Sequence, residues 1–334
     1  MHIPALDGLR GFAAYLVFLS HYSLISGIAG GSFGHGGGQI GVMLFFVLSG
    51  YLMGYLYGDR EPTLSEIGNF ARRRAARVLP LFYFMVTLAF VVSLIVPSLK
   101  TGYPVNDSNL IYHYLLIRGV GPFWTIPVEF QYYGIFCIFW IVGYISRIFL
   151  VLLFVLLIIL MSIWPDLISP ISSMRIFTNA LCFFVLGTLV SYLPLSLTDR
   201  SSNLLFIISL VALPFLFPRL VSNVFGTDLQ PLNAQLIYSM WNAPQYLAFS
   251  GAILISAIFS PFASTIFGSP PARYLGRISY SLYLWQAPCL FILARFIDFR
   301  SAPISGFVIA NVVILIVSDI SYRLVEIPSR RALT

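Results

Sequence analysis

Charged residues are scarce in this sequence. Asp, Glu, Lys and Arg make up 9% of the 334 residues, while 59% are hydrophobic and the mean hydropathy is +0.90. A water-soluble domain carries about 25% charged residues, so this composition excludes an ordinary soluble domain and predicts a polytopic membrane protein. The net charge of +7 is the excess that basic loops on the cytoplasmic side produce, so we do not expect nucleic acid as a partner.

Cysteine is also scarce, which narrows the possible chemistry. The three cysteines, Cys137, Cys182 and Cys289, lie within apolar segments and show no metal-ligand spacing. We therefore interpret them as small core residues and expect no metal. Arg10 followed by an apolar run imitates a signal peptide, but His21 interrupts the run and another apolar segment follows. We therefore expect a retained first helix.

Ten apolar segments are candidates for membrane-spanning helices. The seventh is the weakest, because it is short and contains Pro214. If the N-terminus is cytoplasmic, most of the 19 Lys and Arg residues fall on the cytoplasmic side, as membrane proteins prefer. The sequence thus predicts an all-α, polytopic transmembrane helix bundle of about ten spans, with both termini cytoplasmic and a single domain over residues 1–334. The expected spans are residues 9–29, 38–57, 78–97, 123–145, 148–164, 176–193, 203–217, 245–261, 280–297 and 303–322.

His21 lies in the middle of the first apolar segment. In a helix, the step from Arg10 to His21 makes about three turns, so both side chains share a face, with a rise of roughly 16 Å between them. Arg10 would then lie near a membrane interface and His21 near the midplane. A titratable side chain in hydrocarbon is costly unless it is paired or lines a watery cavity, so His21 is a candidate functional residue. The alternative is a histidine that only hydrogen-bonds a neighbouring helix.

Arg74 and Arg77 lie three residues apart in a basic run that ends before Pro80, and in a helix they share a face. A basic run at a cytoplasmic interface is typical of a topology anchor that contacts lipid phosphates, and the sequence favours this interpretation. The pair could instead grip a phosphorylated ligand, because a planar guanidinium suits bidentate phosphate binding.

Glu129 enters an apolar segment with no cation next to it in sequence. A carboxylate in that position needs a partner, and His21 or an arginine of another helix is the natural candidate. Trp124, Gln131 and Tyr133 flank Glu129, although aromatic residues are ordinary at a membrane interface.

Three simpler positions have structural expectations. Ser49 and Gly50 form a small pair that favours close helix packing. Asp319 and Arg323 lie four residues apart, which predicts a local ion pair. His35 belongs to a glycine-rich loop after the first span, and we expect it to be a solvated loop residue.

Six stretches, taken in order, carry a resemblance to a known family. They are Ile3–Arg10 followed by His21, Gly41–Leu52, Arg74–Pro80, Trp124–Tyr133, Leu275–Pro288 and Val325–Pro328. Together they make the whole chain resemble the acyltransferase 3 family of integral-membrane O-acyltransferases. The chain departs from the family pattern at Pro127, Phe130 and Gln286, where the family has a Ser, a second Glu and a second His. These departures speak against a two-carboxylate or a two-histidine mechanism.

The resemblance implies a reaction and its partners. Such enzymes transfer an acyl group, usually acetyl, from cytoplasmic acyl-CoA to a hydroxyl of a carbohydrate at or beyond the outer face. Acceptors in such families include lipopolysaccharide O-antigens, exopolysaccharides, lipo-oligosaccharide signals, glucans and antibiotics. For this chain, the resemblance implies an integral protein of the bacterial inner membrane, surrounded by membrane lipid. It implies acetyl-CoA as co-substrate, a carbohydrate or lipid-linked glycan as acceptor and no bound cofactor, and it is compatible with an oligomer.

A mechanism follows as a hypothesis. His21 acts as the general base that takes a proton from the sugar hydroxyl as this attacks the thioester, and an acyl-histidine relay is the second variant. Glu129 orients the imidazole, as the acid of a catalytic triad does. Arg74 and Arg77 hold the acyl-CoA phosphates, and Arg10 lines the access path or holds a phosphate. We place Trp124, Gln131, Tyr133 and, four residues apart on one helical face, Ser279 and Tyr283 against the acceptor.

Two other classes of protein stay open at this point. A proton-coupled secondary transporter would use intramembrane His, Glu and Asp residues as a relay, although the two halves of the sequence show no matching pair of broken helices. A lipid-linked sensor or scaffold is the third class. Acyl transfer in purified membranes separates the enzyme from both.

Overall fold

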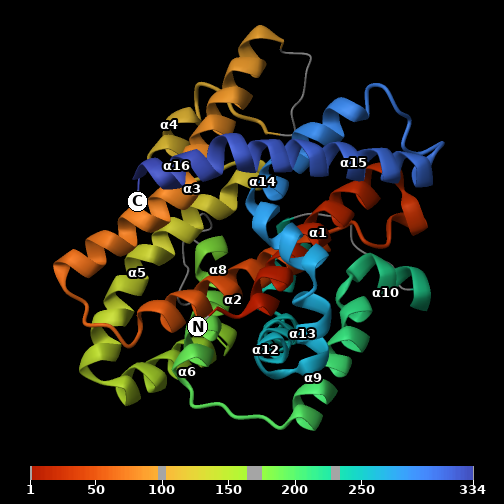
Figure 1. Cartoon of the computed structure of the whole chain (residues 1–334). Coiled ribbons are helices and arrows are strands. Elements are labelled where there is room, and N and C mark those ends of the chain that lie inside the picture. Colours follow the sequence, from red (N-terminus) through yellow and green to blue (C-terminus); the bar gives the residue numbers. More distant parts are fainter. Residues whose placement is uncertain (1, 97–102, 164–174, 227–233, 334) are drawn as a thin grey trace. The chain divides into compact units, whose positions relative to one another are not determined.

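The described part of the chain is helical (Figure 1). The computed structural model describes residues 2–96, 103–163, 175–226 and 234–333, and among these residues there is no β-strand. The ten predicted apolar segments are largely helical wherever they are described, which confirms the all-α fold class. The predicted segment ends at residues 97 and 164 lie outside the described residues. The helices are α1 (Pro4–Ser26), α2 (Gly38–Tyr57), α3 (Leu64–Ile95), α4 (Leu110–Tyr114), α5 (Thr125–Ile145), α6 (Arg147–Ile163), α8 (Arg175–Tyr192), α9 (Asp199–Ala212), α10 (Pro218–Phe225), α11 (Ala234–Asn242), α12 (Pro244–Phe259), α13 (Pro261–Phe267), α14 (Pro270–Leu293), α15 (Pro303–Ser321) and α16 (Ile327–Leu333), with the short turns η1 (Ile28–Gly31), η2 (Gly121–Trp124), η3 (Leu213–Leu216) and the π-helical η4 (Tyr322–Glu326).

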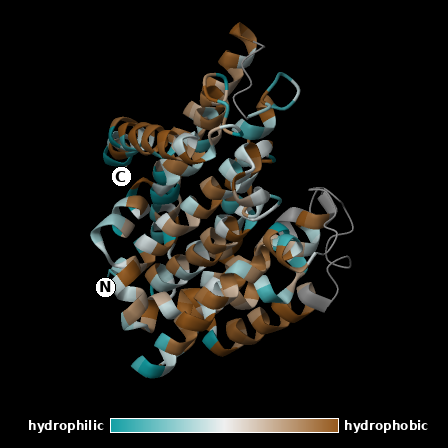
Figure 2. Cartoon of the chain, turned by 90° about the vertical axis from the view of Figure 1, so that its right-hand side faces the viewer, coloured by the Kyte–Doolittle hydropathy of each residue, from teal (hydrophilic) through white to brown (hydrophobic). Residues whose placement is uncertain are grey.

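Several of the described helices are of membrane-spanning type. Long hydrophobic stretches run along many of the helices in Figure 2. Large apolar side chains such as Leu152, which is 62% exposed, lie at the surface, as a lipid-facing surface requires. Helices α1 and α14 are long enough but do not reach the same mean hydropathy, because polar residues interrupt them. Five helices pass by length and composition, namely Gly38–Tyr57, Leu64–Ile95, Gly121–Ile145, Asp199–Leu216 and Pro303–Leu333, and a sixth results if Leu236–Asn242 and Pro244–Phe259, bent by 55°, form one span.

The chain forms two compact units. The first contains Arg10 and His21, and the second contains Arg74, Arg77 and Glu129. The single domain over residues 1–334 stays a prediction. The first unit comprises Met1–Leu24, Ala29–Glu61 and Ile138–Arg277, and the second comprises Ile25–Ile28, Pro62–Cys137 and Ile278–Thr334.

In the first unit, α2 and α8 pack with their backbones in contact. A side chain at Gly50 would collide with the backbone of Phe184, and a side chain at Gly187 would collide with that of Val47. The hydroxyl of Thr188 donates a hydrogen bond to the Gly50 carbonyl at 3.0 Å. Only residues without a Cβ atom allow so close an approach, so the predicted packing role of Gly50 is confirmed.

The start of α1 packs equally closely against α13 and the first turns of α14. Side chains at Gly8 and Gly11 would meet the backbones of Phe267 and Gly276, and a side chain at Gly276 would meet the backbone of Asp7. The glycines of the opening stretch are therefore required by packing. Part of the sequence resemblance thus has a structural reason.

In the second unit, α3 begins at Leu64, well before the span predicted from residue 78. The hydroxyl of Thr63 accepts a hydrogen bond from the Glu66 amide at 3.2 Å and caps the helix. Arginine is a good helix former, so the basic run continues into the apolar span as one helix that contains Pro80. Arg74 therefore belongs to the same continuous helix as the span.

Candidate active site

The basic run on α3 divides into exposed and buried arginines. Arg72 and Arg73 are exposed, whereas Arg77 is half-buried and Arg74 is only 8% exposed. The Arg74 guanidinium lies over the Tyr133 ring, 5.8 Å from its centre, which is cation–π distance. Burying a guanidinium costs free energy, and a topology anchor does not require that burial.

Tyr133 joins Arg74 to Glu129. The Tyr133 hydroxyl donates a hydrogen bond to Glu129 Oε1 at 2.6 Å, one turn back along α5. The sequence predicted His21 or an arginine of another helix as the partner of Glu129, whereas the four-residue spacing to Tyr133 is the signal that indicates this bond. A cation, a phenol and a carboxylate therefore follow one another within the second unit.

Tyr283 fastens α14 to the start of α5. Its hydroxyl donates to the carbonyl of Pro122 at 2.8 Å and accepts from the hydroxyl of Thr125 at 3.2 Å. Ser279 and Tyr283 are 2% and 6% exposed, and Trp124, the last residue of η2, is half-buried. Their predicted contact with the acceptor stays a prediction, since Tyr283 already has a positioning task for α5.

The loop before α5 is held by two polar side chains. The amide of Gln131 donates to the carbonyl of Ile117 at 3.1 Å. His113 is fully buried, its Nδ1 lies 2.8 Å from the Asn109 carbonyl, and its Nε2 accepts from the Val120 amide at 3.1 Å. Burial lowers the pKa of His113, and the two contacts suit the neutral imidazole. Gln131, predicted beside the acceptor, thus ties α5 to this loop.

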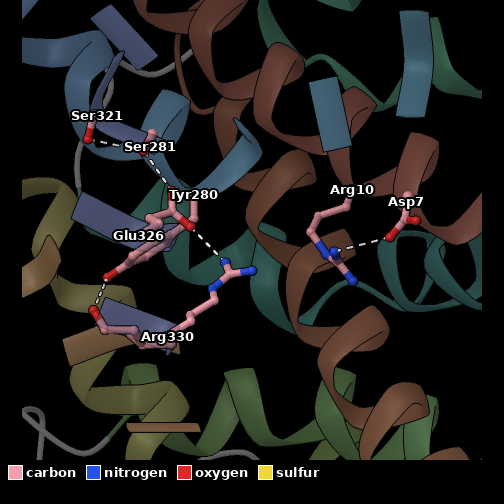
Figure 3. Close-up of polar contacts among 8 residues, drawn as sticks. Asp7, Arg10, Tyr280, Ser281, Ser321, Glu326 and Arg330 are labelled. Carbon is pink, nitrogen blue, oxygen red and sulfur yellow. Dashed lines mark hydrogen bonds and ion pairs between the residues drawn. The ribbon is translucent and has the colours of Figure 1, made fainter. Parts of the chain in front are cut away.

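A buried carboxylate, Glu326, lies after α15 in the stretch Val325–Pro328, for which the sequence predicted no role beyond the resemblance. Glu326 is 1% exposed, and its Oε1 accepts from the hydroxyl of Ser281 at 2.6 Å while its Oε2 accepts from Arg330 at 2.7 Å (Figure 3). Glu326 closes the π-helical turn η4, a distortion that is frequent at functional sites. The available signals were an acidic residue in an apolar stretch and an arginine four residues later.

In the first unit, Arg10 and His21 lie on one uninterrupted helix, α1. The predicted helical spacing between them is therefore confirmed. Arg10 Nη1 lies 3.4 Å from Asp7 Oδ1 (Figure 3), and His2 Nε2 lies 2.7 Å from the other oxygen of the same carboxylate. His21 is half-buried further along the helix. The contact of His21 with Glu129 stays a prediction, as does the contact of Arg10 with a ligand.

His35 differs from its expectation as a solvated loop residue. It is half-buried, its Nδ1 is excluded from solvent, and its φ of +46° lies in the left-handed region. Asn223 holds the same loop by donating to Ser32 Oγ at 3.0 Å. Burial lowers the pKa of His35, and the charge of Arg219 lowers it further. The expectation was wrong because α10 covers a loop that sequence alone places in water.

The two units offer different chemistry. The second unit gathers guanidinium groups, carboxylates and phenols, which suit the binding of an anionic ligand. The first unit carries a half-buried imidazole on α1, which suits proton transfer. In the ranges that the structure describes, no three His, Cys, Asp or Glu side chains gather into a set that could hold a metal ion.

Comparison with known proteins supplies the remaining findings. The family model described as "Acyltransferase domain", acyltransferase 3, matches residues 3–323. The peptidoglycan O-acetyltransferase OatA of Listeria monocytogenes is 26% identical, covering 99% of this chain and 56% of the relative. The O-acetyltransferase OatA of Staphylococcus aureus is 24% identical, covering 99% of this chain and 57% of the relative. The chain thus spans about half the length of the curated relatives that it matches, and no solved structure matches it.

Proposed function

We propose that this chain, which belongs to the acyltransferase 3 family, transfers an acetyl group from acetyl-CoA to a hydroxyl of a cell-wall glycan. The family and the relatives that are named O-acetyltransferases support the prediction that the chain is an O-acyltransferase. The donor, the acceptor and the acting residues are the proposal. Because the Listeria relative is named for peptidoglycan, we favour a glycan of that class over lipopolysaccharide or exopolysaccharide.

We place the enzyme in the cytoplasmic membrane of a bacterium, with ten spans and both termini in the cytoplasm. In that orientation the basic part of α3 lies at the inner face, where acyl-CoA is present, and the C-terminal end of α1 lies at the outer face. The loops carry more Lys and Arg on the side that this orientation makes cytoplasmic.

The observation that carries the proposal is the buried Arg74 beside Tyr133 and Glu129. Arg74 and Arg77 occupy neighbouring turns of α3, and Arg74 is withdrawn from water while the exposed Arg72 and Arg73 are not. A buried guanidinium is best used where it meets a negatively charged group. The phosphates of acetyl-CoA supply such a group, so this pair holds the donor.

His21 carries the chemical step. The acceptor hydroxyl oxygen attacks the thioester carbonyl carbon while the imidazole takes the hydroxyl proton. The carbon–sulfur bond then breaks, CoA leaves as the thiolate, and the imidazolium returns a proton to it. In the second variant the imidazole itself attacks and the acetyl group passes through His21. Glu129 orients the imidazole, and Arg10 lines the access path of the donor.

The experiment uses membranes that contain the wild type, His21→Ala or His35→Ala, supplied with acetyl-CoA labelled in the acetyl group. His35 is the matched control, because it is another half-buried histidine of the same unit. We expect labelled glycan with the wild type and His35→Ala, and a rate lower by about 10² or more with His21→Ala, since a general base contributes that much. Normal labelling by His21→Ala contradicts the role of His21, and thioester consumption by none of the three contradicts the enzyme.

A further inference from the structure

The C-terminal segment of the chain lies against the basic run of α3. The π-helical turn η4 and α16 both pack on α3 in the second unit (Figure 1). The hydroxyl of Tyr280 donates to the carbonyl of Val78 at 2.8 Å and joins α14 to the same part of α3. Three segments that are far apart in sequence therefore meet beside Arg77.

Glu326 determines where the guanidinium of Arg330 points. The carboxylate is fully withdrawn from water, and it accepts one hydrogen bond from Ser281 and one from Arg330 (Figure 3). The hydroxyl of Ser321 lies 3.2 Å from that of Ser281, and it is the donor there because the single Ser281 proton goes to Glu326. The π-helical turn, which ends at Glu326, turns this carboxylate inward and leaves Arg330 one helical turn further on. Arg330 is thus held by a buried anchor, whereas an ordinary surface arginine is not.

The charges around Glu326 do not balance. Arg77 is close enough to act electrostatically on both Glu326 and Arg330. Within the described ranges, no carboxylate forms an ion pair with Arg77, whereas Glu326 is already paired with Arg330. Arg74 and Glu129 act on the same cluster through Tyr133 and Tyr280. Three guanidinium groups therefore face two carboxylates in a partly buried place, where like charges repel more strongly than in water. A bound anion relieves this repulsion.

We propose that Arg330, positioned by Glu326, completes with Arg77 a binding site for the phosphate groups of a soluble polyphosphorylated ligand. The inference rests on the proposed function, in which that ligand is the donor acetyl-CoA. Two guanidinium planes from different helices can each bind a phosphate in bidentate fashion. Arg330 is then a binding residue that no spacing in the basic run reveals, and Glu326 is a positioning residue that acts through it.

The test measures binding separately from transfer. The purified chain in neutral detergent is titrated with CoA and with adenosine 3′,5′-bisphosphate by calorimetry. The variants are Arg330→Gln, Arg330→Lys and the matched control Arg331→Gln, which removes an exposed charge from the adjacent position of α16. We expect a rise in Kd of about tenfold for Arg330→Gln, since a charged hydrogen bond is worth that much. We expect partial recovery with Arg330→Lys, and less than a twofold change with Arg331→Gln.

Glu326→Gln tests the positioning role. It keeps a side chain of the same shape that can still contact Ser281, but it releases Arg330. We expect the KM for acetyl-CoA to rise about fivefold while kcat changes by less than twofold. A purely structural role would instead lower the thermal midpoint and the amount of active protein, leaving the KM unchanged, and this result would overturn the role.

The remaining outcomes also decide the inference. If Arg330→Gln and Arg331→Gln weaken nucleotide binding equally, the inference is overturned, because any positive charge on this surface would then have the same effect. Unchanged CoA binding together with lost retention of phosphatidylglycerol by Arg330→Gln also overturns it, because a lipid head group would then be the ligand. If the wild type binds the nucleotide through Arg330 but transfers no acetyl group, the site stands and the proposed function fails. If Arg330→Gln transfers acetyl with the wild-type KM, the function stands and the site fails.

Discussion

The helices inside the first unit pack in a different way from the helices inside the second unit. In the first, helices α2 and α8, and α1 with α13 and α14, approach until backbone meets backbone at glycines. In the second, helices α3, α5, α14 and α16 are joined by side chains that donate and accept hydrogen bonds or carry charge. The first arrangement leaves no room for an added atom at these glycines, whereas the second is built from separate side-chain contacts that can be lost one at a time. The comparison teaches where mutation should break the fold and where it should change binding.

The largest effect is expected for Gly50→Val. Its side chain would meet the backbone of Phe184, which cannot move without shifting α8, so we expect a loss of about 3 kcal/mol or more in stability. Thermal unfolding and the yield of monodisperse protein measure this loss. Gly134→Ala is the control, because Gly134 is exposed on α5 with open space around it. It should change stability by less than about 1 kcal/mol. Equal losses of stability in Gly50→Val and Gly134→Ala would contradict the idea that close backbone packing at glycines stabilises the first unit.

A smaller effect, on binding and not on the fold, is expected for Arg74→Gln. A hydrogen bond to a charged group contributes about 1.5–3 kcal/mol, so the KM for acetyl-CoA should rise by about tenfold or more while kcat stays within about threefold. Steady-state rates of label transfer measure both. Arg73→Gln, which removes an exposed charge from the same run, should change the KM by less than about twofold. If Arg74→Gln lowers only the amount of protein in the membrane, the topology-anchor interpretation is correct instead.

The smallest effect is a pH dependence of stability that originates at His113. Burial lowers the pKa of His113 in the folded state, so the folded protein favours the neutral imidazole. This stabilisation is complete above the unfolded pKa of about 6.5 and is lost as the pH falls from there towards the folded pKa. We expect the free energy of unfolding to fall between pH 7 and pH 5, by at most about 1.4 kcal/mol per pH unit. The thermal midpoint, measured across this pH range, should fall with it. The slope should be smaller in His113→Gln, and an unchanged slope would assign the effect to other groups, such as His35.

Several local features followed from spacing along the chain. The ion pair of Asp319 with Arg323 is present at 2.7 Å, and Arg10 and His21 share one helix, because residues four or eleven apart have a defined relation in any helix. The bond of Tyr133 to Glu129 follows the same rule. Features of this kind are predictable because they depend on a single element.

Other features depend on residues from distant segments and were not predictable. Ser281 bonds Glu326 across 45 positions of the chain, and no periodicity in either segment indicates that they meet. Arg73 and Arg74 are neighbours in sequence, yet only Arg74 is buried, because burial depends on which helix packs beside α3. The burial of His35 was missed for the same reason, because the helix that covers its loop begins at Pro218, far away in the sequence.

The sequence by itself determined that this chain is an apolar, all-helical member of the acyltransferase 3 family, with Arg10 and His21 on one helix and an arginine pair on another. Composition and local spacing are sufficient for the helices and their shared faces, because a helix satisfies its own backbone hydrogen bonds in a membrane, whereas the family followed from the resemblance of six stretches. Only the tertiary structure decided which arginine is buried, which hydroxyl meets which carboxylate and which backbone each glycine packs against. These contacts depend on which distant segments pack against each other, and the pattern of residues along one segment does not indicate its neighbours.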